Sequence, residues 1–395
     1  MSKKHIIYFP LEPYKERYTV QLSAKEDGWL THRWASHDIP FTYIEGKPLR
    51  ADSTIHNGSV LDANGRGYWC CSQIMNFLER YNNNEFDHLN SVIYFDDMWS
   101  PGIEALAYAF HLTGKPIPMY AMLHAQSIDI FDFTYPMRHW MRHFEKGIGK
   151  LLSGIFVTST VLKDLCLEHG IGNDLNVFTA GLPYNSDMVR EKYLPTEFPE
   201  KKRQVVFSSR LDWEKNPLFF VEVATKVKSI DKTIDFIYTT SKENLGSNDE
   251  HIQKVFEGMG KTDIIEMRVN QDKQQYYQTL LESAVQFNCA WQDFVSWTLL
   301  EALTCHCTPV YPYFRSFPEV LPPNYLYTPE NVDHAVDMIM KKIDEPFNID
   351  LLKIVKGFDN SWARMYEYMN RSGYDVFTVD PLHEDSFMSF WLDKK

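Results

Sequence analysis

The sequence has few cysteines and lacks the cysteine patterns of common metal and redox sites. None of the six stands in a CxxC spacing: Cys70 and Cys71 are adjacent, and Cys305 and Cys307 flank His306. This arrangement predicts reduced, mostly buried thiols rather than a zinc site. The sequence also lacks a GxGxxG motif, which argues against a nicotinamide-dependent dehydrogenase.

Long apolar runs are absent as well. No stretch approaches the length of a membrane span, and Pro10 and Glu12 break the N-terminal run before it could form the apolar core of a signal peptide. We therefore expect a cytoplasmic protein with no membrane span.

Positive charge is in the minority. The chain has 40 Lys and Arg against 53 Asp and Glu, a net charge of −13, which argues against indiscriminate binding to nucleic acid but leaves room for a local basic groove. Its 395 residues are too many for one ordinary core and indicate two domains. Aromatic residues make up 15% of the chain, which suits stacking on sugars or bases as well as core packing.

Strand-like apolar runs alternate with helix-like segments along most of the chain. Such alternation predicts an α/β fold with mostly parallel sheets and helices on both faces. The pattern lapses at 183–203, a charged and proline-punctuated stretch that reads as a linker between two doubly wound halves. The expected strands lie at 5–9, 40–44, 91–95, 117–123, 154–159 and 176–182, then at 204–209, 233–240, 263–269, 284–290 and 308–314.

Two cations follow the first strand of the second half. Arg210 and Lys215 lie five residues apart, just before a helix expected to begin at Pro217. Two permanent cations at such a place can neutralise a diphosphate and stabilise the charge that develops on a leaving nucleotide. The alternative is a surface salt bridge of Arg210 with Asp212 or Glu214.

The stretch 284–319 contains two acids eight residues apart, Asp293 in a loop and Glu301 on the following helix. A strand that enters a helix through such a loop directs the free N–H groups and the positive dipole end of the helix at an anion, so this is a place to bind phosphate. In the alternative interpretation Thr298 and Glu301 form a capping box, and Asp293 merely caps a helix.

Together these motifs resemble the donor site of retaining GT-B glycosyltransferases. The family's acid, seven residues, Glu and small residue correspond to Asp293 and Glu301-Ala302, with an Asp in place of the usual first Glu; Pro309-Val310 and Pro318-Glu319 also match. The resemblance implies two Rossmann-like doubly wound domains with an interdomain cleft. The predicted parts are an acceptor domain at 1–185, a linker at 186–203, a donor domain at 204–358, and a helix and tail at 359–395 that return to the first domain.

The resemblance also implies roles for individual residues. Arg210 and Lys215 bind the donor diphosphate, Asp293 binds the transferred sugar, and Glu301 binds the ribose. The leaving phosphate itself takes the proton of the acceptor hydroxyl, so neither a metal nor a cofactor is required. The remaining donor-binding residues are predicted to be Ser209, Val269, Phe294, Ser296, Trp297 and Thr298.

The first half has its own candidates. His124 follows the expected strand 117–123, and a histidine at the carboxyl end of a parallel strand faces the cleft, where it can donate to a sugar hydroxyl; the alternative is a core histidine. Asp96-Asp97 follows the strand 91–95. These adjacent acids are not a spaced, metal-holding DxD, and we expect them to cap the helix near Pro101 or to contact the acceptor.

A basic ridge follows the His124 loop. Arg138, Arg142 and Lys146 fall at helical i, i+4 spacing, which suggests a phosphate-bearing acceptor; the alternative is an amphipathic helix with solvated charges and with Trp140 and its apolar neighbours inside.

The first half also resembles glycosyltransferases of T-even-type phages, which implies hydroxymethylcytosine in DNA as acceptor. A glycan, lipid or small-molecule acceptor, a nucleotide-sugar epimerase, a phosphorylase and a non-catalytic nucleotide-sugar-binding module remain alternatives.

Overall fold

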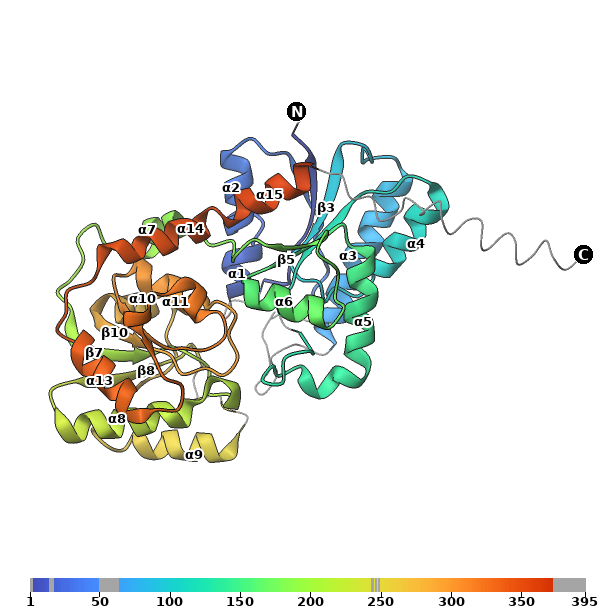
Figure 1. Ribbon diagram of the computed structural model, residues 1–395. Helices are drawn as coiled ribbons and strands as arrows, with labels where there is room; N and C mark the ends of the chain where they lie inside the picture. Colours follow the sequence, from blue (N-terminus) through green and yellow to red (C-terminus); the bar gives the residue numbers. More distant parts are fainter. Residues whose placement is uncertain are drawn as a thin grey trace, which may run out of the picture.

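The chain forms two parallel six-stranded sheets, one in each half (Figure 1). The structure, a computed structural model, describes residues 3–13, 18–49, 64–124, 126–242, 245, 247 and 249–371. The strand orders are β2-β1-β3-β4-β5-β6 and β12-β11-β10-β7-β8-β9, and every pair of neighbours runs parallel. The α/β fold with two doubly wound sheets is therefore confirmed.

In the first half, successive residues of each strand pack on opposite faces of the sheet. In β1, Ile6 and Tyr8 join one apolar cluster and Ile7 joins another. Helices α1, α2 and α15 cover the first face, and α3 to α6 cover the second. The elements are β1 (His5–Phe9), α1 (Tyr18–Ser23), α2 (Trp29–Ser36), β2 (Phe41–Tyr43), α3 (Gly65–Asn82), β3 (Ser91–Phe95), α4 (Ile103–Thr113), β4 (Met119–Met122), α5 (Arg138–Leu151), β5 (Gly154–Val157), α6 (Thr160–Glu168) and β6 (Val177–Thr179).

The second half repeats this plan. Val205 and Val206 of β7 face opposite clusters, because α8 and α13 cover one side of the sheet and α10, α11 and α14 cover the other. The elements are α7 (Ser186–Tyr193), β7 (Lys202–Phe207), α8 (Pro217–Ile230), β8 (Asp235–Thr239), α9 (Glu250–Met259), β9 (Glu266–Arg268), α10 (Lys273–Glu282), β10 (Ser283–Phe287), α11 (Trp297–Thr304), β11 (Thr308–Pro312), α12 (Phe317–Val320), β12 (Leu326–Tyr327), α13 (Val332–Lys342), α14 (Leu352–Asp359) and α15 (Ser361–Arg371).

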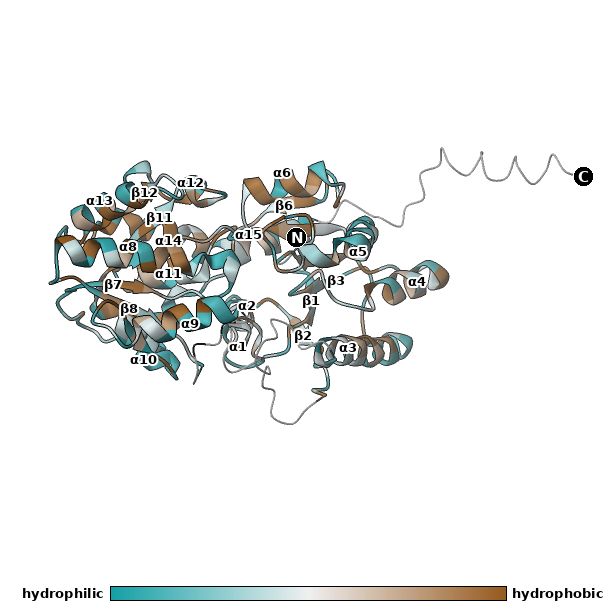
Figure 2. Cartoon of the chain, turned by 90° about the horizontal axis from the view of Figure 1, so that it is seen from below, coloured by the Kyte–Doolittle hydropathy of each residue, from teal (hydrophilic) through white to brown (hydrophobic). Residues whose placement is uncertain are grey.

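The surface helices are amphipathic, with hydrophobic and hydrophilic stripes visible in both halves (Figure 2). Among the described residues, no helix has the length and apolar character needed to cross a membrane.

The segment expected to be an irregular linker contains a helix. Within 183–203, α7 begins after Asn185, whose side chain accepts a hydrogen bond from the Met188 amide, and it buries Val189 while its charged residues remain toward solvent. Strand β7 already begins at Lys202. The sequence pattern hid α7 because an eight-residue helix buries too few apolar residues to show a clear period.

Helix α15 packs against the first sheet. Its Tyr368 ring stacks on Phe178 of β6 at 4.1 Å between centroids, and its Arg364 guanidinium donates to the carbonyl of Ala180 at 2.8 Å. The chain thus returns from the second half to the first, as Figure 1 shows. The boundaries given above for the four parts remain a prediction, and residues 372–395 lie outside the described part of the chain.

Candidate functional site

Lys215 and Asp293 come from two different motifs and meet at the carboxyl edge of the second sheet. Lys215 ends the 3₁₀ turn Trp213–Lys215 after β7, and Asp293 lies in the loop between β10 and α11. The Lys215 Nζ donates to the carbonyl of Gln292 at 2.6 Å and lies 3.8 Å from the Asp293 carboxylate. Both side chains are mostly buried, 13% and 17% exposed, so this pair is fixed by the fold.

Arg210 lies on the same turn, but its charge is neutralised by its neighbours. Its guanidinium pairs with Asp212 at 2.6 Å and with the buried carboxylate of Glu214 at 2.7 Å. The Glu214 carbonyl in turn accepts from the Trp291 amide at 2.8 Å, which ties this turn to the Asp293 loop. The salt-bridge alternative therefore describes Arg210 in this structure, and its side chain remains 41% exposed.

Glu301 is buried and does not form a capping box. Helix α11 has Ser296 as its N-cap residue, with no side-chain capping bond. The Glu301 carboxylate instead accepts hydrogen bonds from the hydroxyls of Tyr276 and Tyr277, each at 2.8 Å, and from Lys273 at 3.3 Å. The capping-box alternative for Glu301 is therefore wrong.

Hydrogen-bonded polar side chains link Glu301 with Tyr311, which lies in the electrostatic field of Asp293. The Tyr311 hydroxyl donates to Gln286 of β10 at 2.6 Å, and Gln286 donates to Ser208 at the end of β7 at 3.1 Å. Burial, and then the charge of Asp293, raise the pKa of Tyr311. Glu301 is thus connected through Tyr276, Ser208 and Gln286 to Tyr311, and Asp293 influences the far end of this network by its charge alone.

The turn 294–298 bridges the two halves. The Phe294 carbonyl accepts from the Thr158 hydroxyl at 2.6 Å, and the Phe294 side chain joins the apolar cluster of the first half. The Trp297 ring lies 5.0 Å from that of Trp29 in α2. Both aromatic side chains thus contact the first half.

Val295, inside this turn, has a backbone conformation that is unfavourable for a β-branched residue. Its φ is +127°, a region that favours glycine. Such conformations cost about 1–3 kcal/mol and occur where the surrounding structure imposes them, often at ligand-binding sites. Next to it, the Ser296 hydroxyl hydrogen bonds to that of Thr298 at 2.7 Å and does not cap α11.

The structure does not bring all the predicted donor residues together. Ser209, half-buried, is the second residue after β7 and adjoins Ser208 of the network. Val269 follows β9, which in the described sheet is the edge strand, two positions from β7. Its half-buried side chain packs against the apolar cluster of the second half, and no described contact joins it to Lys215, Asp293 or Glu301.

His124 lies at the end of β4, as expected, and its ring is held by the backbone. Its Nε2 lies 2.8 Å from the carbonyl of Asp96, so Nε2 carries the proton that donates to it. Burial lowers the pKa of His124, which favours the neutral ring at neutral pH. In this neutral tautomer Nδ1 is an acceptor, so the predicted donation to a sugar hydroxyl does not fit, and only a role as acceptor at the sugar remains a prediction.

Asp96 is fully buried at the end of β3. Its Oδ2 accepts from the Tyr8 hydroxyl, from the Ser23 hydroxyl at 2.7 Å and from the Leu11 amide at 3.3 Å. Burial raises its pKa to about 6 despite these donors. Asp96 therefore joins β1, α1 and β3, and its predicted capping of a helix near Pro101 is wrong.

Asp97 does not cap that helix either. Its carboxylate pairs with Arg66 at 2.9 Å and accepts from the Trp99 amide at 3.0 Å. Helix α4 begins at Ile103, and its N-cap residue is Gly102, which has a positive φ and no side chain to cap with.

The sequence analysis missed a set of contacts across the two halves. Arg315, after β11, pairs with Asp129 of the loop after β4 at 2.5 Å, and Gln292 donates to Asp132 of the same loop at 3.0 Å. Burial raises the pKa of Asp129, although Arg315 and Lys215 oppose the shift, and raises that of Asp132 to about 6. The acids follow a strand that was predicted, but no sequence signal identifies a partner in the other half.

Glu319 also reaches across the halves. Its two carboxylate oxygens accept from the amides of Thr160 and Val161, each at 2.8 Å, at the N-terminus of α6. An acid there offsets the positive dipole end of the helix. Glu319 of the Pro318-Glu319 motif thus joins the second half to α6 of the first half in this structure.

Arg138 and Arg142 lie apart from this network, on α5. The Arg138 guanidinium lies over the Tyr135 ring at 4.2 Å, and that of Arg142 lies 5.9 Å from the same ring. Met141 is buried, as expected for an amphipathic helix, whereas Trp140 is 48% exposed and was wrongly expected inside. The predicted acceptor residues thus fall into two groups, Asp96 and Asp97 within the first domain and the two arginines on its surface.

Within the described ranges, no three His, Cys, Asp or Glu side chains gather as metal ligands would. The absence of a metal and of a cofactor from the reaction remains a prediction.

No family model matches the chain. Among curated proteins, it is similar to a tRNA-queuosine alpha-mannosyltransferase of Drosophila melanogaster, 24% identical over 199 residues, which are 50% of this chain and 49% of that protein. The match therefore spans only about half the length of the curated relative.

Solved structures show the fold. The catalytic domain of starch synthase IV from Arabidopsis thaliana, bound to ADP and acarbose, superposes with a TM-score of 0.61 at 10% identity over 96% of this chain and 100% of that chain. A UDP-forming trehalose-phosphate synthase of Burkholderia vietnamiensis gives 0.59 at 12% over 96% and 98%, and sucrose-phosphate synthase of Thermosynechococcus elongatus gives 0.55 at 12% over 100% of both. The chain has the two-domain, Rossmann-like GT-B fold, as predicted.

Proposed function

We propose that the protein is a retaining glycosyltransferase that moves a sugar from a nucleotide diphosphate sugar, a UDP-sugar in the first instance, to an acceptor hydroxyl. One observation carries the proposal: Lys215 and Asp293, from separate motifs, form a mostly buried pair at 3.8 Å at the carboxyl edge of the second sheet. Ligands of open α/β sheets bind at this edge. The GT-B fold supports the reaction class by analogy.

The donor diphosphate would be held by Lys215, Arg210 and the start of α11. The N-cap of that helix makes no side-chain bond, so the backbone amides of the turn 294–298 are suited to receive an anion. We expect Lys215 to contribute more than Arg210 to binding of the diphosphate, because two carboxylates already neutralise Arg210 in this structure.

Glu301 would bind the ribose, and Asp293 the transferred sugar. A carboxylate offers about four acceptor positions, and Glu301 uses three of them for its two tyrosines and Lys273. One position on Oε2 is left for a ribose hydroxyl. The other residues assigned to the donor are Ser209, Val269, Phe294, Ser296, Trp297 and Thr298.

The proposed chemistry needs no protein nucleophile. The bond between the sugar C1 and the phosphate oxygen breaks while the acceptor oxygen bonds to C1 on the same face, and the acceptor proton passes to the leaving phosphate. Lys215 and Arg210 stabilise the charge on that phosphate, and His124 orients a sugar hydroxyl. Catalysis then rests on orientation and fixed charge rather than on a metal or cofactor.

The proposed acceptor is a hydroxyl on a modified base of a nucleic acid, in the first instance hydroxymethylcytosine in DNA. A second candidate is a hydroxyl of a modified tRNA nucleoside, which the name of the curated relative favours. In both cases the base must leave the stack to reach a buried site. Asp96 and Asp97 are the residues assigned to the acceptor, and the Asp97 side chain is partly buried.

The test is a screen of donors against acceptors by mass spectrometry. UDP-, ADP- and GDP-sugars are combined with hydroxymethylcytosine DNA, cytosine DNA and tRNA, using the wild type, Lys215→Met and Lys228→Met. Lys228 is the matched control, because it is 15% exposed, pairs with Asp235 at 3.3 Å, and lies in the last turn of α8, whereas Lys215 precedes the first turn. We expect a hexose on one hydroxyl-bearing acceptor with the wild type and Lys228→Met alone. A sugar altered without acceptor would indicate an epimerase, and binding without turnover would indicate a binding module.

A further inference from the structure

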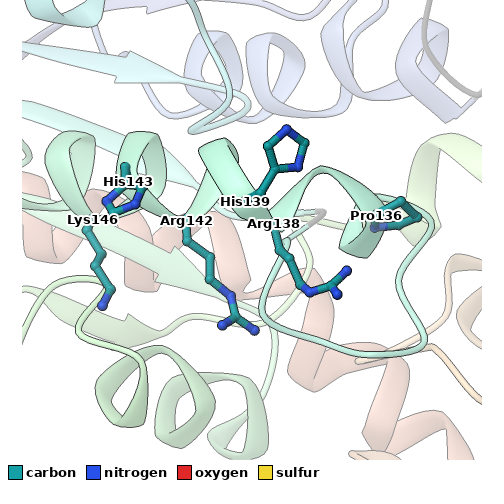
Figure 3. A pocket seen from close by; sticks show the side chains of 6 residues that line it. All are labelled: Pro136, Arg138, His139, Arg142, His143 and Lys146. Carbon is teal, nitrogen blue, oxygen red and sulfur yellow. The ribbon is translucent and has the colours of Figure 1, made fainter.

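One face of α5 forms an open basic hollow of about 470 Å³. Its lining comes from one short stretch of chain, and Figure 3 shows Arg138, Arg142 and Lys146 extending on the same side of the helix while His139 points away from them. The full lining is Pro136, Arg138, His139, Arg142, His143 and Lys146.

No carboxylate of the described residues forms a salt bridge with this hollow. Within the residues that the structure describes, none of its five basic side chains forms an ion pair, although the chain as a whole carries a net charge of −13. Glu145, the acid on the same helix, is buried and accepts from Ser127 and from the Trp99 indole. The Glu145 charge offsets part of that of Arg142, but the hollow remains positive, and such a concentration of positive charge on an acidic protein indicates an anionic ligand.

The spacing of the cations suits a repeating anion rather than a single one. Arg138, Arg142 and Lys146 are four residues apart, so they rise about 6 Å from one to the next and span about 12 Å. At about 3.4 Å of helix axis per phosphate of one strand, that length covers about three to four phosphate intervals. The Tyr135 ring beneath Arg138 and Arg142 holds their guanidinium groups in place before binding.

The hollow begins where the first half touches the second. The Tyr135 amide donates to the Asp132 carbonyl at 2.9 Å, and the Asp132 carboxylate accepts from Gln292, whose carbonyl is bound by Lys215. A strand lying along α5 would therefore lead toward the proposed donor site.

We infer that the α5 hollow docks the sugar-phosphate backbone of the DNA strand that carries the acceptor base. The choice of DNA as the partner rests on the proposed function. The α5 hollow is an additional surface, which holds the DNA outside the reaction centre. Arg138, Arg142 and Lys146 bind successive phosphates, so the contact is sequence-independent and sensitive to salt.

The test measures DNA binding without a donor, by fluorescence anisotropy of a labelled single strand of about 16 nucleotides over a series of salt concentrations. The hollow variant is Arg138→Glu/Lys146→Glu, because both side chains are exposed. The matched control is Lys254→Glu/Lys261→Glu, two exposed lysines at α9 whose reversal changes the net charge equally. Lys215→Met serves as the control for chemistry.

We expect the hollow variant to weaken binding by at least about tenfold near 50 mM salt and to reduce the slope of log K against log salt by about 1.4, which corresponds to two lost phosphate contacts. The charge-matched control and Lys215→Met should bind as the wild type does. Unchanged affinity in the hollow variant, an equal loss in the matched control, or tighter binding of tRNA than of DNA would each overturn the inference. Transfer in Lys215→Met tests the proposed function alone, because this variant should still bind DNA. Failure of the proposed function can therefore be distinguished from failure of the DNA-docking inference.

Discussion

The ion pair between Arg315 and Asp129 gives a prediction whose size follows from the structure. Asp129 is 0% exposed, and its Oδ1 accepts from Arg315 at 2.5 Å and from the Phe131 amide at 3.1 Å. Replacing Arg315 by Met leaves a buried carboxylate without its cation. Breaking such a pair costs about 3–5 kcal/mol, because one charge remains uncompensated.

Protonation of Asp129 limits this cost. At 1.36 kcal/mol per pH unit above the ordinary pKa of 3.8, a neutral carboxyl costs ~4 kcal/mol near pH 7 but only ~2 kcal/mol near pH 5. Burial already raises the pKa of Asp129, so its protonated form is favoured in the fold and its contribution to stability is lost as pH rises above 3.8. Removing Arg315 raises that pKa further, and the destabilisation of Arg315→Met must therefore grow with pH.

The assay is urea unfolding of the wild type, Arg315→Met, Asp129→Asn and the double variant, at about pH 5 and about pH 8, with calorimetry as a second probe because two domains need not unfold together. We expect the double variant to be more stable than Arg315→Met at the higher pH, since it has no buried charge to protonate. A loss in Arg315→Met that is equal at both pH values, or a double variant as unstable as the sum of the two single variants, would refute this reasoning.

Other perturbations have equally definite outcomes. Lys215→Met should lower kcat about 10²–10³-fold in the transfer assay, while Lys215→Arg retains part of the activity because it keeps the charge. Asp96→Asn should remove a pH dependence of the unfolding free energy: burial raises the pKa of Asp96 to about 6, so its contribution to stability falls as pH rises from about 4 toward 6, and unfolding followed by fluorescence should show no such fall in the variant. Glu319→Gln should cost about 1 kcal/mol of stability, since it weakens the cap on α6 from the other half.

Each of these has an outcome that contradicts it. Normal turnover in Lys215→Met would reject the role of Lys215 in transfer. An unaltered pH dependence in Asp96→Asn would assign that titration to another group, such as Asp132, whose pKa is also raised to about 6. A Glu319→Gln variant as stable as the wild type would show that solvent replaces this cap without loss.

Much of the fold could be predicted because each signal is local. Helix α8 spans 217–230, as expected, since Pro217 suits the first helical position and the apolar period continues to Ile230. Strand β1 occupies the predicted 5–9, a short apolar run next to a proline. The two-residue β12 and the short α12 were missed, because segments of that length have no readable period.

The candidate site was less predictable, because side-chain partners depend on the tertiary structure. Arg210 and Lys215 look equivalent in sequence, yet Arg210 pairs with the acids beside it and Lys215 with a loop about 80 residues away. Nothing in the sequence showed that Tyr276 and Tyr277 would occupy the carboxylate of Glu301. The contacts of Arg315 and Glu319 join distant loops, so they follow from the packing of the two halves and not from any motif.

The central claim is that Lys215, Asp293 and Glu301 form one site for a nucleotide diphosphate. It is tested most directly by isothermal titration of UDP, ADP and GDP into the wild type, Lys215→Met, Glu301→Gln and the control Lys228→Met. We expect one nucleotide bound per chain, at least about tenfold weaker binding (about 1.4 kcal/mol) in both Lys215→Met and Glu301→Gln, and unchanged binding in Lys228→Met. Binding that is equally tight in all four proteins, or that is lost in Lys228→Met as well, would contradict it.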